Sequence, residues 1–196
     1  MNDNPYKAPE SDLTIAAGES NTHFYVVSVN KFTMLFFLTL GIYALYWFYK
    51  NWKEYKEYSG KKIWPVPRAI FSIFFTHSLF SEVESSLKSK DKSFDWNPSS
   101  LATAYVILAI VSQILDKMSM KEIGSPISDL SSILILALMY MPLLKAQKAI
   151  NFSQGDPEGH SNELFTGANY VWMVIGILLW LMTLFGFMVM FGLINI

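Results

Sequence analysis

The sequence predicts an all-α fold: an integral membrane helical bundle with four transmembrane helices plus one short interfacial or re-entrant helix. Hydrophobic residues make up 52% of the 196 residues and charged residues only 16%, whereas soluble domains carry roughly 25% charged residues. The apolar residues are gathered in blocks, several of them long enough to cross a hydrocarbon core of about 30 Å. Most lysines lie in clusters beside these blocks, which is typical of loops retained in the cytoplasm.

The chain opens with a polar segment that we expect to form a flexible tail over residues 1–30. It is rich in Asn, Pro, Ser and Glu and has too few apolar residues to build a core. It also lacks the charged-then-apolar pattern of a cleaved signal peptide. Residues 31–196 are expected to form a single helical membrane domain.

The first predicted span covers residues 32–49, FTMLFFLTLGIYALYWFY, which contain no charge. Aromatic and basic residues crowd its far end and the stretch that follows, as they do where lipid tails meet headgroups. A basic loop of this kind predicts a first helix that runs from outside to inside. The expected membrane-interface anchors are Trp47, Tyr49, Lys50, Trp52 and Lys53, with Trp172 at a later span.

The interfacial helix is expected at about residues 66–81. The segment from Trp64 to Phe80 is apolar but short, is opened by Pro65 and Pro67, and contains Arg68 and His77. Segments of this length more often lie in the interface than cross the bilayer. We place it on the cytoplasmic face with Ile70, Phe71, Ile73, Phe74, Phe75 and Phe80 among the acyl chains. A shallow true span over this stretch stays an open alternative.

Three further spans are predicted at about residues 101–117, 129–146 and 169–194. With four spans, eleven lysines and arginines fall inside and four outside, so both termini are expected outside. If residues 66–81 spanned as well, the count would be eight against seven. The four on the outside are Lys7, Lys31, Lys117 and Lys121.

Several segments of the chain together resemble a known group of sequences. They are the tail NPYKAPES, the stretch VSVNKFTMLFFLTLGIYALYWFYKNWKEYK, the following IWPVPRAIF, and later AQKAIN with the loop before NYVWMVIG. The chain resembles small Gram-negative inner-membrane proteins that carry an Asn-Pro-Tyr-x-Ala-Pro tail and a Thr-Leu-Gly-Ile-Tyr…Tyr-Trp-Phe-Tyr-Lys first span, a domain of unknown function. The resemblance implies a multi-pass protein of the bacterial inner (cytoplasmic) membrane. It implies little about activity, because it offers no established catalytic residues to carry over.

The second and third spans carry small and polar residues on one face. Such a face usually marks where a membrane helix packs on another helix or on a partner, because close approach replaces the missing hydrophobic drive. At 100° per residue, five residues of the second span fall within an arc of about 80°. The predicted packing or partner face comprises Ala102, Tyr105, Ala109, Ser112 and Asp116, with Ser132 and Tyr140 on the third span.

No motif for catalysis, metal binding or a cofactor is present in the sequence. Cysteine is absent, and His23, His77 and His160 are spread over tail, interfacial helix and loop without metal-ligand spacing. The basic residues form no field suited to nucleic acid. We therefore expect no catalytic site, no metal and no cofactor.

The leading hypothesis is a non-enzymatic membrane protein that acts through protein–protein interaction in a regulatory, sensing or immunity-type role. Its partners would be the lipid bilayer and another membrane protein or a membrane-targeting toxin. One alternative is a small transporter or channel subunit whose polar route is lined by Asp116, Asp129 and Tyr140. Another is a lipid-modifying enzyme using His77 with Glu82 and Glu84. The sequence does not indicate an oligomeric state.

Overall fold

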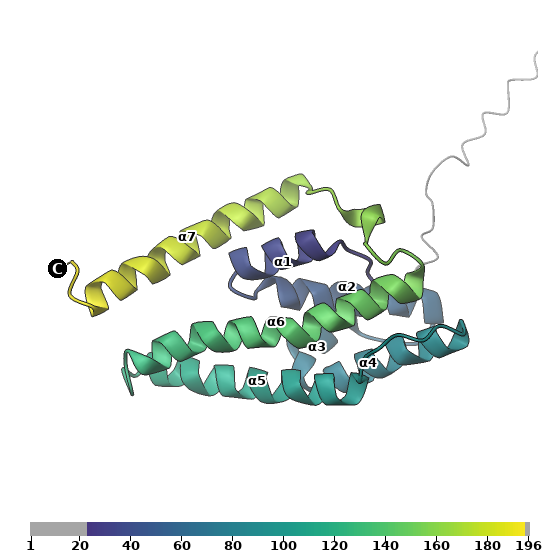
Figure 1. The fold of residues 1–196 in the computed structure, drawn as a ribbon, viewed down its shortest axis with the longest axis horizontal. Helices are drawn as coiled ribbons and strands as arrows, with labels where there is room; N and C mark the ends of the chain where they lie inside the picture. Colours follow the sequence, from purple (N-terminus) through teal and green to yellow (C-terminus); the bar gives the residue numbers. More distant parts are fainter. Residues whose placement is uncertain (1–22, 195–196) are drawn as a thin grey trace, which may run out of the picture.

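The computed structural model describes residues 23–194, in which all regular structure is helical (Figure 1). Seven α-helices and one short 3-10 helix follow one another along the chain. They are α1 (Val29–Leu38), α2 (Tyr43–Ser59), α3 (Pro65–Ile70), α4 (Ser72–Ser89), α5 (Pro98–Ser119), α6 (Ile127–Gln154), η1 (His160–Asn162) and α7 (Gly167–Met190).

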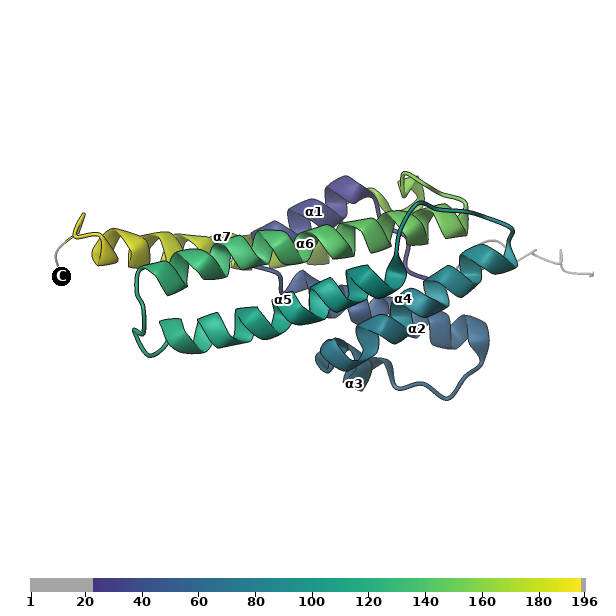
Figure 2. The same cartoon turned by 60° about the horizontal axis from the view of Figure 1, so that its bottom comes forward.

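The first predicted span is not one helix but a hairpin of α1 and α2, which point in roughly opposite directions (Figures 1 and 2). The chain turns at residues 39–42, where Leu40 and Gly41 adopt positive φ angles of 51° and 82°. The Gly41 N–H donates back to the Phe36 carbonyl at 2.8 Å. The Thr39 hydroxyl accepts from the Tyr43 N–H at 3.0 Å and so satisfies the first backbone N–H of α2, which has no partner within the helix. A continuous helix over residues 32–49 is therefore wrong.

One stripe of α2 faces the interior of the protein. Its buried residues recur every three or four positions, as expected for an amphipathic helix packed on a core. They are Tyr43, Ala44, Trp47, Phe48, Asn51, Trp52 and Tyr55. The lysines and glutamates between them leave α2 unlike a membrane span, and at 10 residues α1 is too short to cross a bilayer.

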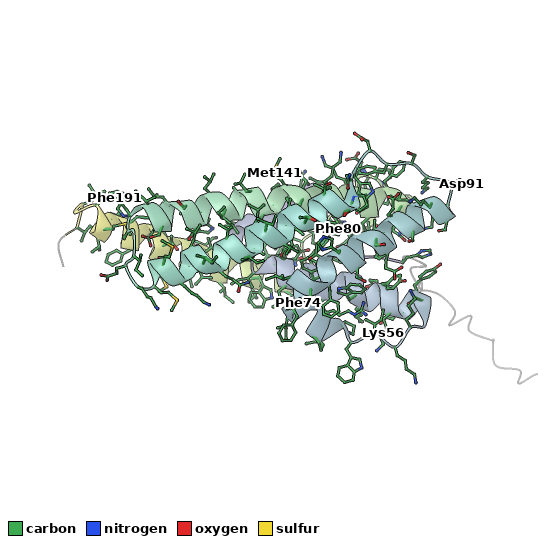
Figure 3. All side chains as sticks on the ribbon, turned by 90° about the horizontal axis from the view of Figure 1, so that it is seen from below. Lys56, Phe74, Phe80, Asp91, Met141 and Phe191 are labelled. Carbon is green, nitrogen blue, oxygen red and sulfur yellow. The ribbon has the colours of Figure 1, made fainter. Side chains whose placement is uncertain are left out.

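Helices α3 and α4 cover the predicted interfacial stretch and are separated by a break at Phe71. Five large apolar side chains are exposed here, and Figure 3 shows Phe74 pointing away from the ribbon. They are Trp64, Val66, Ile70, Phe71 and Phe74. Phe80 was expected among them but is fully buried, while Ile73 and Phe75 pack against the core.

Three helices are long and apolar enough to cross a membrane: α5, α6 and α7. They match the second, third and fourth predicted spans, and the count of four spans is not confirmed. Helices α5 and α6 form a close antiparallel pair (Figure 2). Helix α6 has 28 residues and is about 42 Å long at 1.5 Å per residue, longer than a hydrocarbon core. Pro142 lies inside it.

The hydrophobic core is confined to one end of the molecule. Every residue of the core cluster belongs to residues 24–109 or 143–150. Beyond this packed end (residues 23–109 and 143–166), α5, α6 and α7 continue together with apolar side chains exposed (Figures 1 and 2). Exposed apolar surface of this extent is unusual in soluble proteins and is expected of helices that face lipid.

Part of the segment that was predicted to be a flexible tail is packed into the fold. Residues 1–22 lie outside the described residues. Residues 23–28 form an extended segment in which Phe24, Val26 and Val27 are buried. The expectation of a flexible segment up to residue 30 is therefore wrong for residues 23–30, since the core holds the first part and α1 contains the last two.

Candidate functional site

The predicted packing face on α5 is occupied within the chain along its first half. Ala102, Tyr105 and Ala109 are buried, and the ring of Tyr105 lies 5.5 Å from that of Phe48 on α2. Towards the far end of α5 the same face opens, with Ser112 half-buried and Asp116 exposed. The first half of the face, with Ala102, Tyr105 and Ala109, therefore packs α5 against other helices of the same chain.

The two residues predicted on α6 are both half-buried. The Ser132 hydroxyl donates to the Ser128 carbonyl of its own helix at 3.2 Å. The Tyr140 hydroxyl is hydrogen-bonded to the Thr33 hydroxyl of α1, and its ring packs within 6 Å of those of Phe32, Phe36 and Phe37. Tyr140 therefore joins α6 to the hairpin.

Two of the predicted membrane anchors lie in the core instead. Trp47 and Trp52 are fully buried because they belong to the inward stripe of α2. The Trp47 indole N–H donates to the side-chain oxygen of Gln147 at 2.5 Å, and the guanidinium of Arg68 lies 4.3 Å from the ring of Trp52. Tyr49, Lys50 and Lys53 are half-buried, and Trp172 is 50% exposed.

The residues of the suggested polar route do not gather in one place. Asp129 accepts a hydrogen bond from the Ser119 hydroxyl at the turn between α5 and α6, where Asp116 is exposed. Tyr140 lies eleven residues further along α6, which is about 16 Å away along the helix axis, and its hydroxyl is bonded to Thr33.

The acidic and histidine side chains of the suggested enzyme site are also apart. The His77 ring bonds the Thr103 hydroxyl at 3.0 Å, Glu82 accepts from Lys61, and Glu84 accepts from the Trp96 indole N–H. Within residues 23–194, no group of three His, Cys, Asp or Glu side chains is placed to hold a metal ion.

A cluster of buried amide side chains holds the extended segment 23–28, and the sequence analysis missed it. Asn151 binds Val27 on both sides, accepting from its N–H at 3.3 Å and donating to its carbonyl at 2.9 Å. Gln147 donates to the Tyr25 carbonyl at 3.2 Å and to Asn151 at 2.6 Å. Asn51 accepts from the Tyr25 N–H at 3.2 Å. We call Asn51, Gln147 and Asn151 the amide clamp.

The loop between α6 and α7 closes the other side of this segment. Asn162 donates to the Val26 carbonyl at 2.9 Å and accepts from Lys31, which is 2% exposed. Lys31 also donates to the Leu164 carbonyl at 2.7 Å, and burial lowers the pKa of this amine. Gly159, at φ +72°, approaches so closely that a Cβ there would lie 2.5 Å from the carbonyl carbon of Val27.

A signal for the clamp is present in the sequence. Gln147 and Asn151 are four residues apart in α6, so both lie on the same face of the helix, together with Leu143 and Ile150. Buried amides need hydrogen-bond partners, and this spacing indicates a polar ligand for that face. Only the tertiary structure shows that the ligand is the backbone of residues 25–27.

Helix α7 is attached to the rest of the protein mainly through α1. Gly176 is its one buried residue, and a Cβ there would lie 2.0 Å from the Leu38 carbonyl oxygen. One turn further, the Trp180 indole N–H donates to the Phe37 carbonyl at 2.8 Å. Beyond these contacts most of α7 is exposed. Figure 1 shows its far end approaching the turn between α5 and α6, where the Ser125 hydroxyl lies 3.7 Å from the Met190 sulfur.

Comparison of the chain with protein-family models, with curated proteins and with solved structures finds no match.

Proposed function

We propose that the chain is a non-enzymatic multi-pass protein of the bacterial inner membrane that acts by binding another protein within the membrane. The observation that carries this proposal is the free face of α7. Helices in lipid are held together by close packing, and α7 contributes only the strip around Gly176 and Trp180 to the contact with α1. The resemblance stated above supports the inner-membrane location.

For the membrane we propose three spans, α5, α6 and α7, with the α1–α2 hairpin entering and leaving on the same side. Helix α1 has 10 residues and would reach about 15 Å, half of a hydrocarbon core. The hairpin, the basic loops and the ends of α4 and α6 then share one side. Twelve of the described lysines and arginines fall on that side and two on the other, which favours a cytoplasmic packed end. The two are Lys117 and Lys121.

Cysteine labelling distinguishes this arrangement from four spans, since the chain has no native cysteine. Single cysteines at Ser20, Ser89, Ser119 and Ser161 are treated with an impermeant maleimide from outside intact cells. We expect labelling at Ser119 alone. Four spans would place Ser20 outside too, because α1 and α2 would then cross as one helix. Labelling at Ser20 would therefore refute the re-entrant hairpin, and permeabilised cells provide the control for reactivity.

The proposed binding face is the side of α7 turned away from α1. Leu178 lies about 200° around the helix from both Gly176 and Trp180 at 100° per residue and is 56% exposed. Leu181 and Phe185 follow on the same side and are 56% and 51% exposed. A partner helix that docks here would meet a continuous apolar surface without disturbing the α1 contact.

Photo-crosslinking in cells tests this face. A benzophenone amino acid at Leu178 should give one discrete adduct with a membrane protein or toxin that mass spectrometry identifies, and Leu181→Trp on the same face should abolish it. The control positions lie on α5, where Ile110 and Ile114 are 46% and 53% exposed and stand in for Leu178 and Leu181. A label at Ile110 should give no such adduct, and Ile114→Trp should leave the Leu178 adduct intact. Adducts that are absent, or equal at Leu178 and Ile110, would contradict partner binding through α7.

A further inference from the structure

A groove of about 500 Å³ lies between the hairpin and the first turns of α7. Its size falls within the range of about 300–1,000 Å³ seen for small-molecule sites. The floor is formed by Leu35, Thr39, Tyr43 and Ala69, which are all buried. Its rim is formed by exposed residues from α2, α3 and α7, among them Ile42, Tyr46, Val66, Ile70, Ala168 and Trp172.

The polar atoms in the floor are already paired within the protein. The Thr39 hydroxyl donates to the Leu35 carbonyl at 2.7 Å and accepts from the Tyr43 N–H. The Tyr43 hydroxyl lies 3.3 Å from that of Tyr25. A peptide or a polar solute in the groove would lose its hydrogen bonds to water without replacement, which is costly. A hydrocarbon chain has no hydrogen bonds to water to lose, so the floor of the groove favours hydrocarbon over a polar ligand.

The two ends of the groove differ in chemistry. Leu35 and Ile42 lie towards the turn of the hairpin. In the other direction, Tyr46 and Tyr49 are followed on the same face of α2 by Lys53, since residues three and four apart are neighbours on a helix. Residues 50–68 follow directly on the lining residue Tyr49 and carry six lysines and arginines against two glutamates, Glu54 and Glu57, which pair with Lys50 and Lys53. The net charge beside this end of the groove is therefore positive. An amphiphile with an apolar tail and an anionic head fits this gradient.

We propose that the groove binds one acyl chain of an anionic membrane phospholipid, with the phosphate headgroup towards Tyr49 and Lys53. The exposed apolar residues Val66 and Ile70 on the rim would let the chain enter sideways from the bilayer. The bound lipid would join α7 to α2 and α3, which do not pack directly on α7. This inference requires a membrane setting but not a protein partner for α7.

The test uses the full chain in detergent micelles and phosphatidylglycerol with a diazirine on one acyl chain. After illumination, adducts should map to groove residues such as Ile42, Val66 and Trp172. Unlabelled phosphatidylglycerol should displace them, and phosphatidylcholine should do so less well. Adducts on the exposed face of α5, at Ile107, should decrease equally with phosphatidylglycerol and with phosphatidylcholine, because lipids there exchange freely and either one dilutes the label.

Two groove variants and one matched control complete the experiment. Ala168→Trp places an indole in the mouth and should reduce the displaceable adducts about tenfold, equivalent to about 1.4 kcal/mol. Ile42→Trp does the same from the hairpin end and serves if the first variant elutes abnormally in size exclusion. Ala137→Trp, at an exposed alanine on α6, should change nothing. Adducts spread evenly over α5, α6 and α7 would overturn the proposal, and equal displacement by phosphatidylcholine would overturn the anionic headgroup. If lipid binds in the groove but the label at Leu178 on α7 gives no protein adduct, only the proposed protein partner is refuted and the lipid site stands.

Discussion

Replacing Asn151 with leucine should lower the free energy of unfolding by about 3 kcal/mol or more. The side chain is fully buried and pairs with the Val27 N–H, the Val27 carbonyl and the Gln147 amide. Leucine has a similar size but would leave both Val27 groups without this partner, at about 1–3 kcal/mol each, and would remove one of the two hydrogen bonds that the Gln147 amide donates. In a chain of this length the melting temperature changes by about 2–4 °C per kcal/mol, so thermal unfolding in detergent should show a decrease of about 6 °C or more.

The matched control is Asn30→Leu. Asn30 is exposed in the first turn of α1, and surface substitutions usually change stability by less than about 0.5 kcal/mol. Limited proteolysis adds a second measurement, because an undocked segment 23–28 should be cleaved faster in Asn151→Leu than in Asn30→Leu. If both variants melt alike and resist protease alike, the amide clamp does not hold the segment.

The break between α1 and α2 shows why the first predicted span was misjudged. Thr39 is the C-cap of α1, and Gly41 takes the positive φ that glycine favours where a helix ends. Both sit inside an uncharged block of 18 apolar or weakly polar residues, and hydropathy outweighed these local signals. The hairpin is stabilised by contacts from distant elements. The Leu136 side chain of α6 packs where a Gly41 Cβ would project, and no window of the sequence contains that contact.

The burial of Trp47 and Trp52 has a related cause. Aromatic residues followed by lysines are typical of a membrane interface, but they recur here every three to four residues, a spacing that also forms a core-facing stripe. Composition favours the first interpretation and periodicity the second. The buried partner Gln147 lies a hundred residues away, so the choice depended on tertiary structure.

The long apolar helices were predictable because their signals agree. For α5, α6 and α7, length, hydropathy and flanking polar residues all indicate a helix able to span a membrane. Ala102, Tyr105 and Ala109 also share one face by helical spacing alone, and all three are buried. The groove could not be predicted, and for the amide clamp the spacing of Gln147 and Asn151 indicates a shared face but not its ligand, since each site joins residues more than a hundred positions apart.

Replacing Gly176 with alanine adds a single methyl group and should nevertheless lower the stability of the protein strongly. The added Cβ would lie 2.0 Å from the Leu38 carbonyl oxygen and 2.7 Å from its carbon. These are backbone atoms that cannot rotate away, so α7 must move from α1. The Trp180 bond to the Phe37 carbonyl at 2.8 Å would be lost with it. Overpacking of this kind costs about 1–3 kcal/mol, and the loss of the bond adds to it. We expect a melting temperature lower by several degrees.

Gly186→Ala makes the same substitution ten residues further along the same helix, where a Cβ would meet nothing within 4 Å. Alanine is favoured over glycine inside a helix by about 1 kcal/mol, so this variant should melt at the same or a higher temperature. The sign of the change should therefore differ between the two positions. Trp180 provides a local measurement, because its indole should become more accessible to a brominated detergent in Gly176→Ala and not in Gly186→Ala. Equal melting temperatures and equal quenching in the two variants would show that α7 does not rest on α1 through Gly176.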